Sequence, residues 1–199
     1  VVGYTNIDGK GLSGIEKGLN KKLNNNEDIF LSLDLRLQNI VTEELESAIT
    51  RFNATGGNAI ILDAETGQIL ASTSLPNFNP NNINNLKNEK FFNMATQGVF
   101  EMGSTFKPIT MAIGLDSNVI NENSEFNVEE PYKIGRKLIE DHSPQKGNLS
   151  IKEIIVHSSN IGTAQIAKLI GKPIQKKYLK KLGLLNIQLT EMPKPKVAW

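Results

Sequence analysis

The stretch from Glu101 to Pro108 constrains the fold most, because it sets a serine and a lysine at the start of an apolar helix. Apolar residues follow Lys107 at helical spacing, and Gly103 marks the end of an irregular approach. Ser104 is therefore predicted at a helix N-terminus, where unpaired N–H groups and the helix dipole favour negative charge on its oxygen. A separation of three residues places Lys107 on the same face. We therefore expect the amine to reach the hydroxyl.

This pairing suits a serine nucleophile with a lysine base. A lysine in water has a pKa of about 10.4 and is protonated at neutral pH. We expect Phe106, Met102 and the apolar helix to bury Lys107 and to lower its pKa, so that the neutral amine accepts a proton. Ser104 would then attack a carbonyl and form an acyl-enzyme.

A second Ser-x-x-Lys, Ser143-Pro144-Gln145-Lys146, shows that the bare pattern also arises by chance. It lies between Asp141 and Gly147 in turn-like sequence, and no apolar helix follows it. We interpret this second copy as accidental.

Another polar element, Ser158-Ser159-Asn160, is the only Ser-x-Asn in the chain. With Ser104 and Lys107, it resembles the motifs of the penicillin-binding proteins. Ser159 stands where class A β-lactamases have aspartate, which favours penicillin-binding proteins. The resemblance implies that Ser158 relays protons between Lys107 and the leaving amine. It also implies that Asn160 binds the donor's backbone amide or helps to orient Lys107.

The chain resembles class B members of this family in particular, the division (FtsI-like) and elongation transpeptidases. The implied function is a peptidoglycan D,D-transpeptidase, in which Ser104 attacks the penultimate D-Ala carbonyl of a stem peptide and the amine of a second stem peptide takes the acyl group. β-Lactams would remain covalently bound at Ser104. The resemblance implies no cofactor and no metal, possible partners in the division machinery, and a periplasmic catalytic domain whose inner-membrane anchor is not in this chain.

Two other functions stay open. A class D-like β-lactamase or β-lactam sensor domain shares the Ser-x-x-Lys element, and it would show fast deacylation or a carboxylated Lys107. A truncated, non-catalytic binding protein of the division machinery is the other alternative, and a downstream sequence without Lys-Thr-Gly would favour it.

The expected fold class is α/β of the α+β kind, with helices packed on an antiparallel sheet as in the penicillin-binding protein/β-lactamase-like transpeptidase fold. Residues 29–33 are predicted as a strand that ends at Asp34, a good helix cap. An amphipathic helix should follow and end at Gly56-Gly57. Residues 59–63 and 68–72 then predict a hairpin, in which Glu65-Thr66-Gly67 has only a structural role. Further expectations are a loop over 77–93, a strand over 132–134, a capping box of Ser150 and Glu153, and a helix over 163–170.

The resemblance also suggests a domain division. Residues 1–30, which begin with a short strand and a turn-rich connection, would be the end of a non-catalytic pedestal and its linker. Residues 31–199 would be the amino-terminal portion of the transpeptidase domain. No Lys-Thr-Gly occurs in the sequence, so the fold is expected to be incomplete. The isolated fragment is therefore expected to be inactive.

Composition excludes several other functions. A net charge of +1 without a basic stripe argues against nucleic acid as a partner. The absence of cysteine excludes disulfides and thiolate metal sites. His142 and His157 make a poor metal site, and no Gly-x-Ser-x-Gly elbow supports a hydrolase triad with Asp141.

Overall fold

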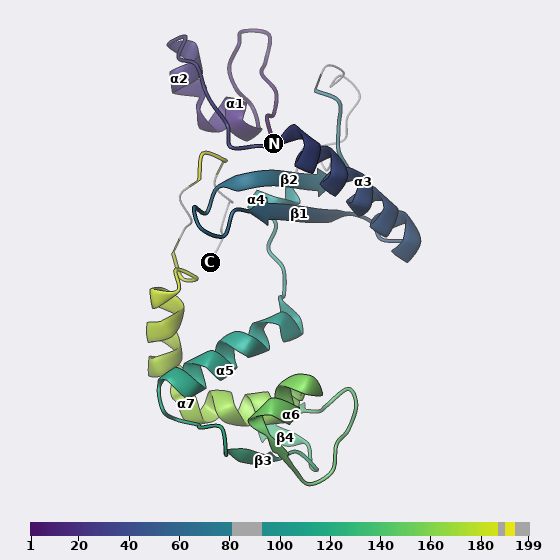
Figure 1. Cartoon of the computed structure of the whole chain (residues 1–199), viewed down its shortest axis with the longest axis vertical. Coiled ribbons are helices and arrows are strands. Elements are labelled where there is room, and N and C mark those ends of the chain that lie inside the picture. Colours follow the sequence, from purple (N-terminus) through teal and green to yellow (C-terminus); the bar gives the residue numbers. More distant parts are fainter. Residues whose placement is uncertain (81–92, 187–189, 194–199) are drawn as a thin grey trace. The chain divides into compact units, whose positions relative to one another are not determined.

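The computed structural model describes residues 1–80, 93–186 and 190–193. The chain divides into two compact units, Val1–Phe100 with Leu189–Trp199 and Glu101–Gln188 (Figure 1). None of the helices in these described ranges combines the length and the apolar character needed to cross a membrane. The predicted change near residue 30 from pedestal to transpeptidase domain stays a prediction.

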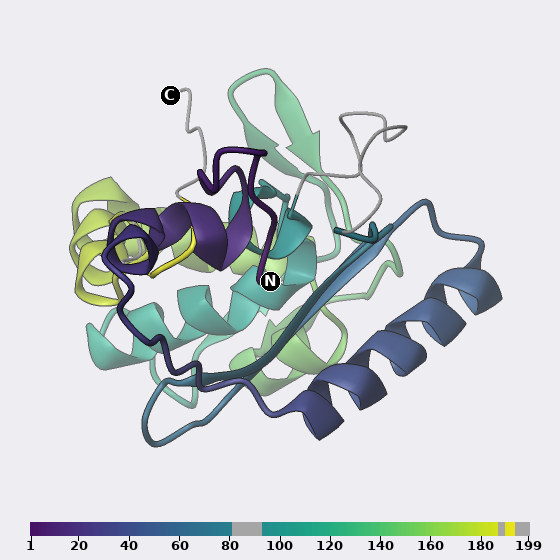
Figure 2. The same ribbon diagram turned by 90° about the horizontal axis from the view of Figure 1, so that it is seen from above.

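The first unit is built on a helix packed against a two-stranded antiparallel sheet. Helix α3 (Leu35–Phe52) lies along strands β1 (Gly57–Leu62) and β2 (Ile69–Leu75), as Figures 1 and 2 show. In the ladder Ile60 pairs with Ser72, and the register shifts between Ile61 and Leu62. The predicted hairpin and the predicted helix on the sheet are confirmed.

Polar contacts fix α3 on β2 and shape the hairpin turn. Gln38 Oε1 accepts from the backbone N–H of Ser72 at 3.0 Å, and the hydroxyls of Thr42 and Thr73 lie 3.1 Å apart. In the turn, the Asp63 carboxylate accepts from the backbone N–H groups of residues 65 and 66 at 3.0 and 2.7 Å. The predicted structural role of the Glu65-Thr66-Gly67 turn agrees with these contacts.

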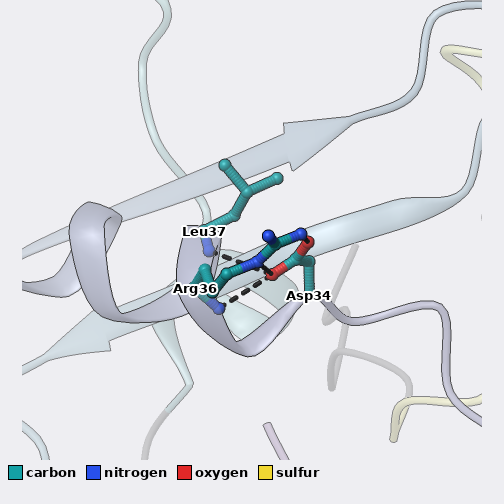
Figure 3. Close-up of polar contacts among 3 residues, drawn as sticks. All are labelled: Asp34, Arg36 and Leu37. Atoms are coloured by element: carbon teal, nitrogen blue, oxygen red, sulfur yellow. Dashed lines mark hydrogen bonds and ion pairs between the residues drawn. The ribbon is translucent and has the colours of Figure 1, made fainter.

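Asp34 caps the start of α3, as predicted (Figure 3). Its Oδ1 accepts from the backbone N–H of Arg36 at 2.8 Å and of Leu37 at 3.4 Å. The Arg36 side chain, 2.9 Å from Oδ2, is the main cause that lowers the pKa of Asp34 to about 2, and the backbone bond to Arg36 adds to it. Because this pKa is depressed, the cap stabilises the fold above the ordinary aspartate pKa of 3.8, and the contribution is lost as pH falls toward 2.

Two predictions in this unit are wrong. Residues 29–33 form no strand, and Phe30 is 93% exposed. The segment meets the start of β2 through only two bonds, from Ser32 Oγ to the Ile69 carbonyl and from the Asp34 N–H to the Leu70 carbonyl, which is too few for a ladder. The helix expected to end at Gly56-Gly57 ends earlier, at Phe52. Its C-cap Asn53 takes the left-handed conformation with φ of 50°, and Gly57 already begins β1.

The remaining elements of this unit are short. They are α1 (Gly14–Gly18), α2 (Asn20–Asn24) and α4 (Met94–Gln97). The strand predicted in the opening residues is reduced to one bridge between Thr5 and Gly11. In the predicted loop, residues 77–80 contain no helix or strand, and residues 81–92 lie outside the described part of the chain.

The second unit packs helices over two small two-stranded sheets. A 3₁₀ turn, η2 (Gly103–Phe106), leads into α5 (Lys107–Asp116), and α6 (Ile151–Val156) precedes α7 (Asn160–Lys181), which is kinked at Gly171. One sheet pairs β3 (Glu125–Asn127) with β6 (Asn148–Ser150), and the other is a hairpin of β4 (Tyr132–Ile134) and β5 (Lys137–Ile139).

Three predictions in this unit are confirmed. The strand over 132–134 is β4, and the capping box of Ser150 and Glu153 starts α6. The helix expected over 163–170 lies within the longer α7.

The core of this unit lies between α5 and α7. It consists of Met111, Ile113, Ile120, Phe126, Val128, Leu149, Ile151, Ile154, Ile161, Ile166 and Ile170. A Cβ at Gly114 on α5 would meet Ile120 at 2.9 Å and Ile166 at 3.3 Å, so the helices approach closely there. This core holds the start of α5 and the start of α7 in one compact unit.

Replacing Ile166 by alanine is expected to lower the free energy of unfolding by about 2–5 kcal/mol, because its fully buried side chain would leave a cavity. Leu169 lies on the same helix and is 57% exposed, so its alanine variant serves as the control and should change stability little. Denaturant unfolding of both variants tests this. Equal losses would show that the packing between α5 and α7 does not support the unit.

Candidate active site

Ser104 lies in the turn just ahead of α5. Gly103 has a φ of 55°, in the left-handed region, so the chain enters η2 through a conformation that glycine adopts readily. Ser104 is exposed within this 3₁₀ turn, and Lys107 is the first residue of α5. The predicted placement at the start of a helix is confirmed, with the refinement that Ser104 lies in the 3₁₀ turn and not in the α-helix itself.

Three side chains form one line of hydrogen bonds. Lys107 Nζ lies 3.0 Å from Ser158 Oγ, and Ser158 Oγ lies 3.1 Å from Ser104 Oγ. Lys107 Nζ also donates to the backbone carbonyl of Ser158. Residues separated by about fifty positions in the sequence are therefore in contact.

The direct reach of the amine to the serine is not observed. Within the described residues, Lys107 forms its hydrogen bonds with Ser158, whose hydroxyl lies between Lys107 and Ser104. The i, i+3 spacing places both side chains on one side of the turn, but the amine bonds to the Ser158 hydroxyl that lies between them. The Ser158 hydroxyl is therefore within hydrogen-bond distance of both groups, and its predicted role as a proton relay stays a prediction.

Burial lowers the pKa of Lys107, and the nearby carboxylate of Asp141 opposes this by raising it. The net direction agrees with the sequence expectation. Met102 and Phe106, which were expected to cover the amine, are themselves 61% and 37% exposed. A lowered pKa enlarges the fraction of neutral amine, which is the form that accepts a proton.

Ser158 occupies a strained backbone conformation between α6 and α7. Its φ is 53°, in the left-handed region that residues with a Cβ seldom adopt. In this conformation both its carbonyl and its hydroxyl meet Lys107. Strain of this kind persists only where the surroundings hold it, and it is concentrated at functional sites.

Asp141 anchors the turn that follows Ser158. Its Oδ2 accepts from Ser159 Oγ at 2.7 Å, while Oδ1 accepts from the backbone N–H groups of Asn160 and, at 3.0 Å, Ile161. Ser159 is 1% exposed and caps α7 by accepting from the N–H of Gly162 at 3.0 Å. The sequence did not predict this role of Asp141, because no local pattern joins residues 18 to 20 positions apart.

Asn160 is tied to the same segment. Its Nδ2 donates to the Glu140 carbonyl at 2.8 Å. This bond uses the donor end of the amide and leaves the carbonyl end as the group that can accept from a substrate N–H. Its predicted role toward a substrate or toward Lys107 stays a prediction.

The remaining candidates lie outside this line of contacts. Ser143 and Lys146 belong to an exposed loop, where the Ser143 carbonyl accepts from Gln145 Nε2. His142 and His157 are exposed, and neither imidazole bonds to a serine in the part of the chain that the structure describes. Nor do the described residues contain a group of three or more His, Cys, Asp or Glu side chains arranged to hold a metal.

Comparison with known families agrees with this geometry. The family model described as penicillin binding protein transpeptidase domain matches residues 57–194, which include Ser104, Lys107, Ser158 and Asn160. The chain belongs to the penicillin-binding protein transpeptidase family. The mixed fold of helices and antiparallel strands is that of this family.

Several relatives are similar over most of the chain. The probable peptidoglycan D,D-transpeptidase FtsI of Caulobacter vibrioides is 36% identical over 203 residues, which cover 98% of this chain and 34% of that protein. The peptidoglycan D,D-transpeptidase FtsI of Escherichia coli K12 is 33% identical over 193 residues, covering 84% of this chain and 32% of that protein. The chain therefore spans about a third of the length of these curated relatives.

A solved structure shows the same fold. The crystal structure of a putative peptidoglycan glycosyltransferase from Atopobium parvulum superposes with a TM-score of 0.81 at 28% identity, and the match covers 92% of this chain and 46% of that one.

Proposed function

We propose that this chain carries the nucleophile and the base of a peptidoglycan D,D-transpeptidase that cross-links stem peptides through a serine acyl-enzyme. The observation that carries the proposal is the line of hydrogen bonds from Ser104 through Ser158 to Lys107, in a member of the transpeptidase family. On this proposal the catalytic domain works in the periplasm as part of a membrane-anchored protein, alongside division proteins.

Acylation begins with a neutral Lys107. Lys107 Nζ lies within hydrogen-bond distance of both the carbonyl and the hydroxyl of Ser158. A neutral amine in this place would donate to the carbonyl and accept from the hydroxyl. As Ser104 Oγ attacks the penultimate D-Ala carbonyl, its proton passes to Ser158 Oγ, and the Ser158 proton passes to Lys107 Nζ. The Ser104 N–H is one donor to the oxyanion that forms.

The proton then returns along the same line. The terminal D-Ala amine leaves with a proton from Ser158, which Lys107 replaces. Attack by the amine of a second stem peptide reverses these transfers and completes the cross-link. Asn160 binds the donor's backbone amide through its side-chain carbonyl or helps to orient Lys107, and a β-lactam that acylates Ser104 stays attached.

Reaction of the intact protein with a D-Ala-D-Ala stem peptide and an acceptor amine tests this function. Release of D-Ala together with a cross-linked product is expected. Rapid hydrolysis of a penicillin, with carboxylated Lys107, would instead indicate the β-lactamase alternative. Absence of any acylation would indicate the binding protein. The 199-residue chain alone is expected neither to label detectably with penicillin nor to turn over a D-Ala-D-Ala peptide, because its sequence contains no Lys-Thr-Gly.

Acylation by penicillin is expected to accelerate with rising pH, with a midpoint below the ordinary lysine pKa of about 10.4. The reason is that burial lowers the pKa of Lys107, so that the reactive neutral amine appears at lower pH. The acylation rate constant measured across pH checks this. The Lys146→Ala variant should keep the same profile, and a midpoint at or above the ordinary value would contradict the proposed base.

A further inference from the structure

We infer that Asp141 is a positioning residue, which holds the turn after Ser158 so that the Ser158 hydroxyl stays between Ser104 and Lys107. The inference rests on the proposed function. It assigns a task to a residue outside the Ser-x-x-Lys and Ser-x-Asn motifs. Asp141 itself does not touch the reacting oxygen of Ser104 among the contacts described.

The carboxylate of Asp141 binds three successive residues. It accepts from the Ser159 hydroxyl and from the backbone N–H groups of Asn160 and Ile161, so both of its oxygens are engaged. These N–H groups belong to the first turn of α7. N–H groups in a first turn have no partner within the helix, and a carboxylate there also complements the positive end of the helix dipole.

Ser159, the middle residue of the Ser-x-Asn motif, links Asp141 to Ser158. Ser159 is 1% exposed, and its hydroxyl both donates to Asp141 and accepts from the Gly162 N–H. Ser159 therefore has little freedom to rotate. Ser158, its direct neighbour, keeps a φ of 53° that its own side chain disfavours.

A second tie joins the same two segments. Asp141 follows strand β5 by two positions, and the Glu140 carbonyl accepts from Asn160 Nδ2 at 2.8 Å. Glu140 and Asp141, which follow β5, thus bond to Asn160 and to the residues directly before and after it. Without the carboxylate, Ser158 can relax toward ordinary backbone angles, which moves its hydroxyl away from Lys107 and Ser104.

Asp141 also has an electrostatic effect that a merely structural residue would not have. Its negative charge raises the pKa of Lys107 against the lowering by burial, and among the described residues it is the charged group that acts on this amine. Removing that charge therefore lowers the pKa of Lys107 further. The acid limb of the acylation profile should then move to lower pH, even as the maximal rate falls.

The test compares variants of the intact protein by the second-order rate constant for penicillin acylation across pH, with thermal unfolding in parallel. Asp141→Ala is expected to slow acylation about a hundredfold, the order of loss that follows a misplaced reacting group. Asp141→Asn should recover part of the rate, because an amide oxygen still accepts from the two backbone N–H groups. Both variants should shift the acid limb to lower pH. Glu130→Ala, which removes an exposed carboxylate of the same unit, should match the wild type.

The outcomes separate the two proposals. If the wild-type protein is not acylated at Ser104, the proposed function fails. If it is acylated and Asp141→Ala reacts at the wild-type rate, or with an unmoved acid limb, the positioning role is wrong. Loss of folded protein in both Asp141 variants would also overturn the inference, because the carboxylate would then support the fold as a whole.

Discussion

Replacing Ser104 by alanine is expected to abolish covalent labelling of the intact protein by fluorescent penicillin while leaving the fold in place. The loss should approach a millionfold, as it does when a serine nucleophile is removed from other enzymes. Ser104 is exposed and lies in a short turn outside the buried core, so an alanine there removes the hydroxyl without opening a cavity. Gel fluorescence after a timed exposure measures the labelling.

Ser143→Ala is the matched control, since Ser143 belongs to the other Ser-x-x-Lys of the chain. It should label like the wild type, because Ser143 lies in an exposed loop. Residual labelling of Ser104→Ala would show that another residue is the nucleophile. Equal loss in both variants would show that the two copies cannot be told apart by their helical context.

Replacing Lys107 by alanine is expected to slow acylation by about 10²- to 10⁴-fold, the usual contribution of a general base. Alanine is a good first residue for α5, so the helix should form normally. Ser158→Ala should also slow the reaction, because it removes the hydroxyl between the amine and Ser104.

The double variant that combines Lys107→Ala with Ser158→Ala tests whether the two side chains act as one proton relay. If the proton passes through Ser158, the double variant should be little slower than the worse single variant, because either change already breaks the line. Fully additive losses in stopped-flow acylation would indicate that Lys107 acts on Ser104 without Ser158.

Local sequence patterns predicted the parts of the fold that local contacts determine. The cap at Asp34 and the capping box at Ser150 each depend on side chains within three residues of their partners, and both are present. The hairpin of β1 and β2 follows from two β-like runs and a short turn. The apolar residues of segment 29–33 predicted a strand. A strand forms only where a neighbouring strand pairs with it in register, and the composition of a segment does not indicate such a partner.

The candidate site was predictable to the same degree. Spacing placed Ser104 and Lys107 on one side of a turn, and the family motif brought in Ser158. The direct bond from Lys107 to Ser104 was expected but is absent, because a side chain from a distant turn lies between them. The bonds of Asp141 are likewise tertiary, and no spacing rule in the sequence indicates them.

Peptide mapping of the penicillin adduct by mass spectrometry tests the central claim most directly. Trypsin does not cleave the Lys107–Pro108 bond readily, so the three candidate serines fall in separate peptides, residues 91–133 with Ser104, 138–146 with Ser143 and 153–168 with Ser158. The account predicts the adduct on peptide 91–133, with fragment ions that place it on Ser104. An adduct on peptide 138–146 or 153–168 would contradict it.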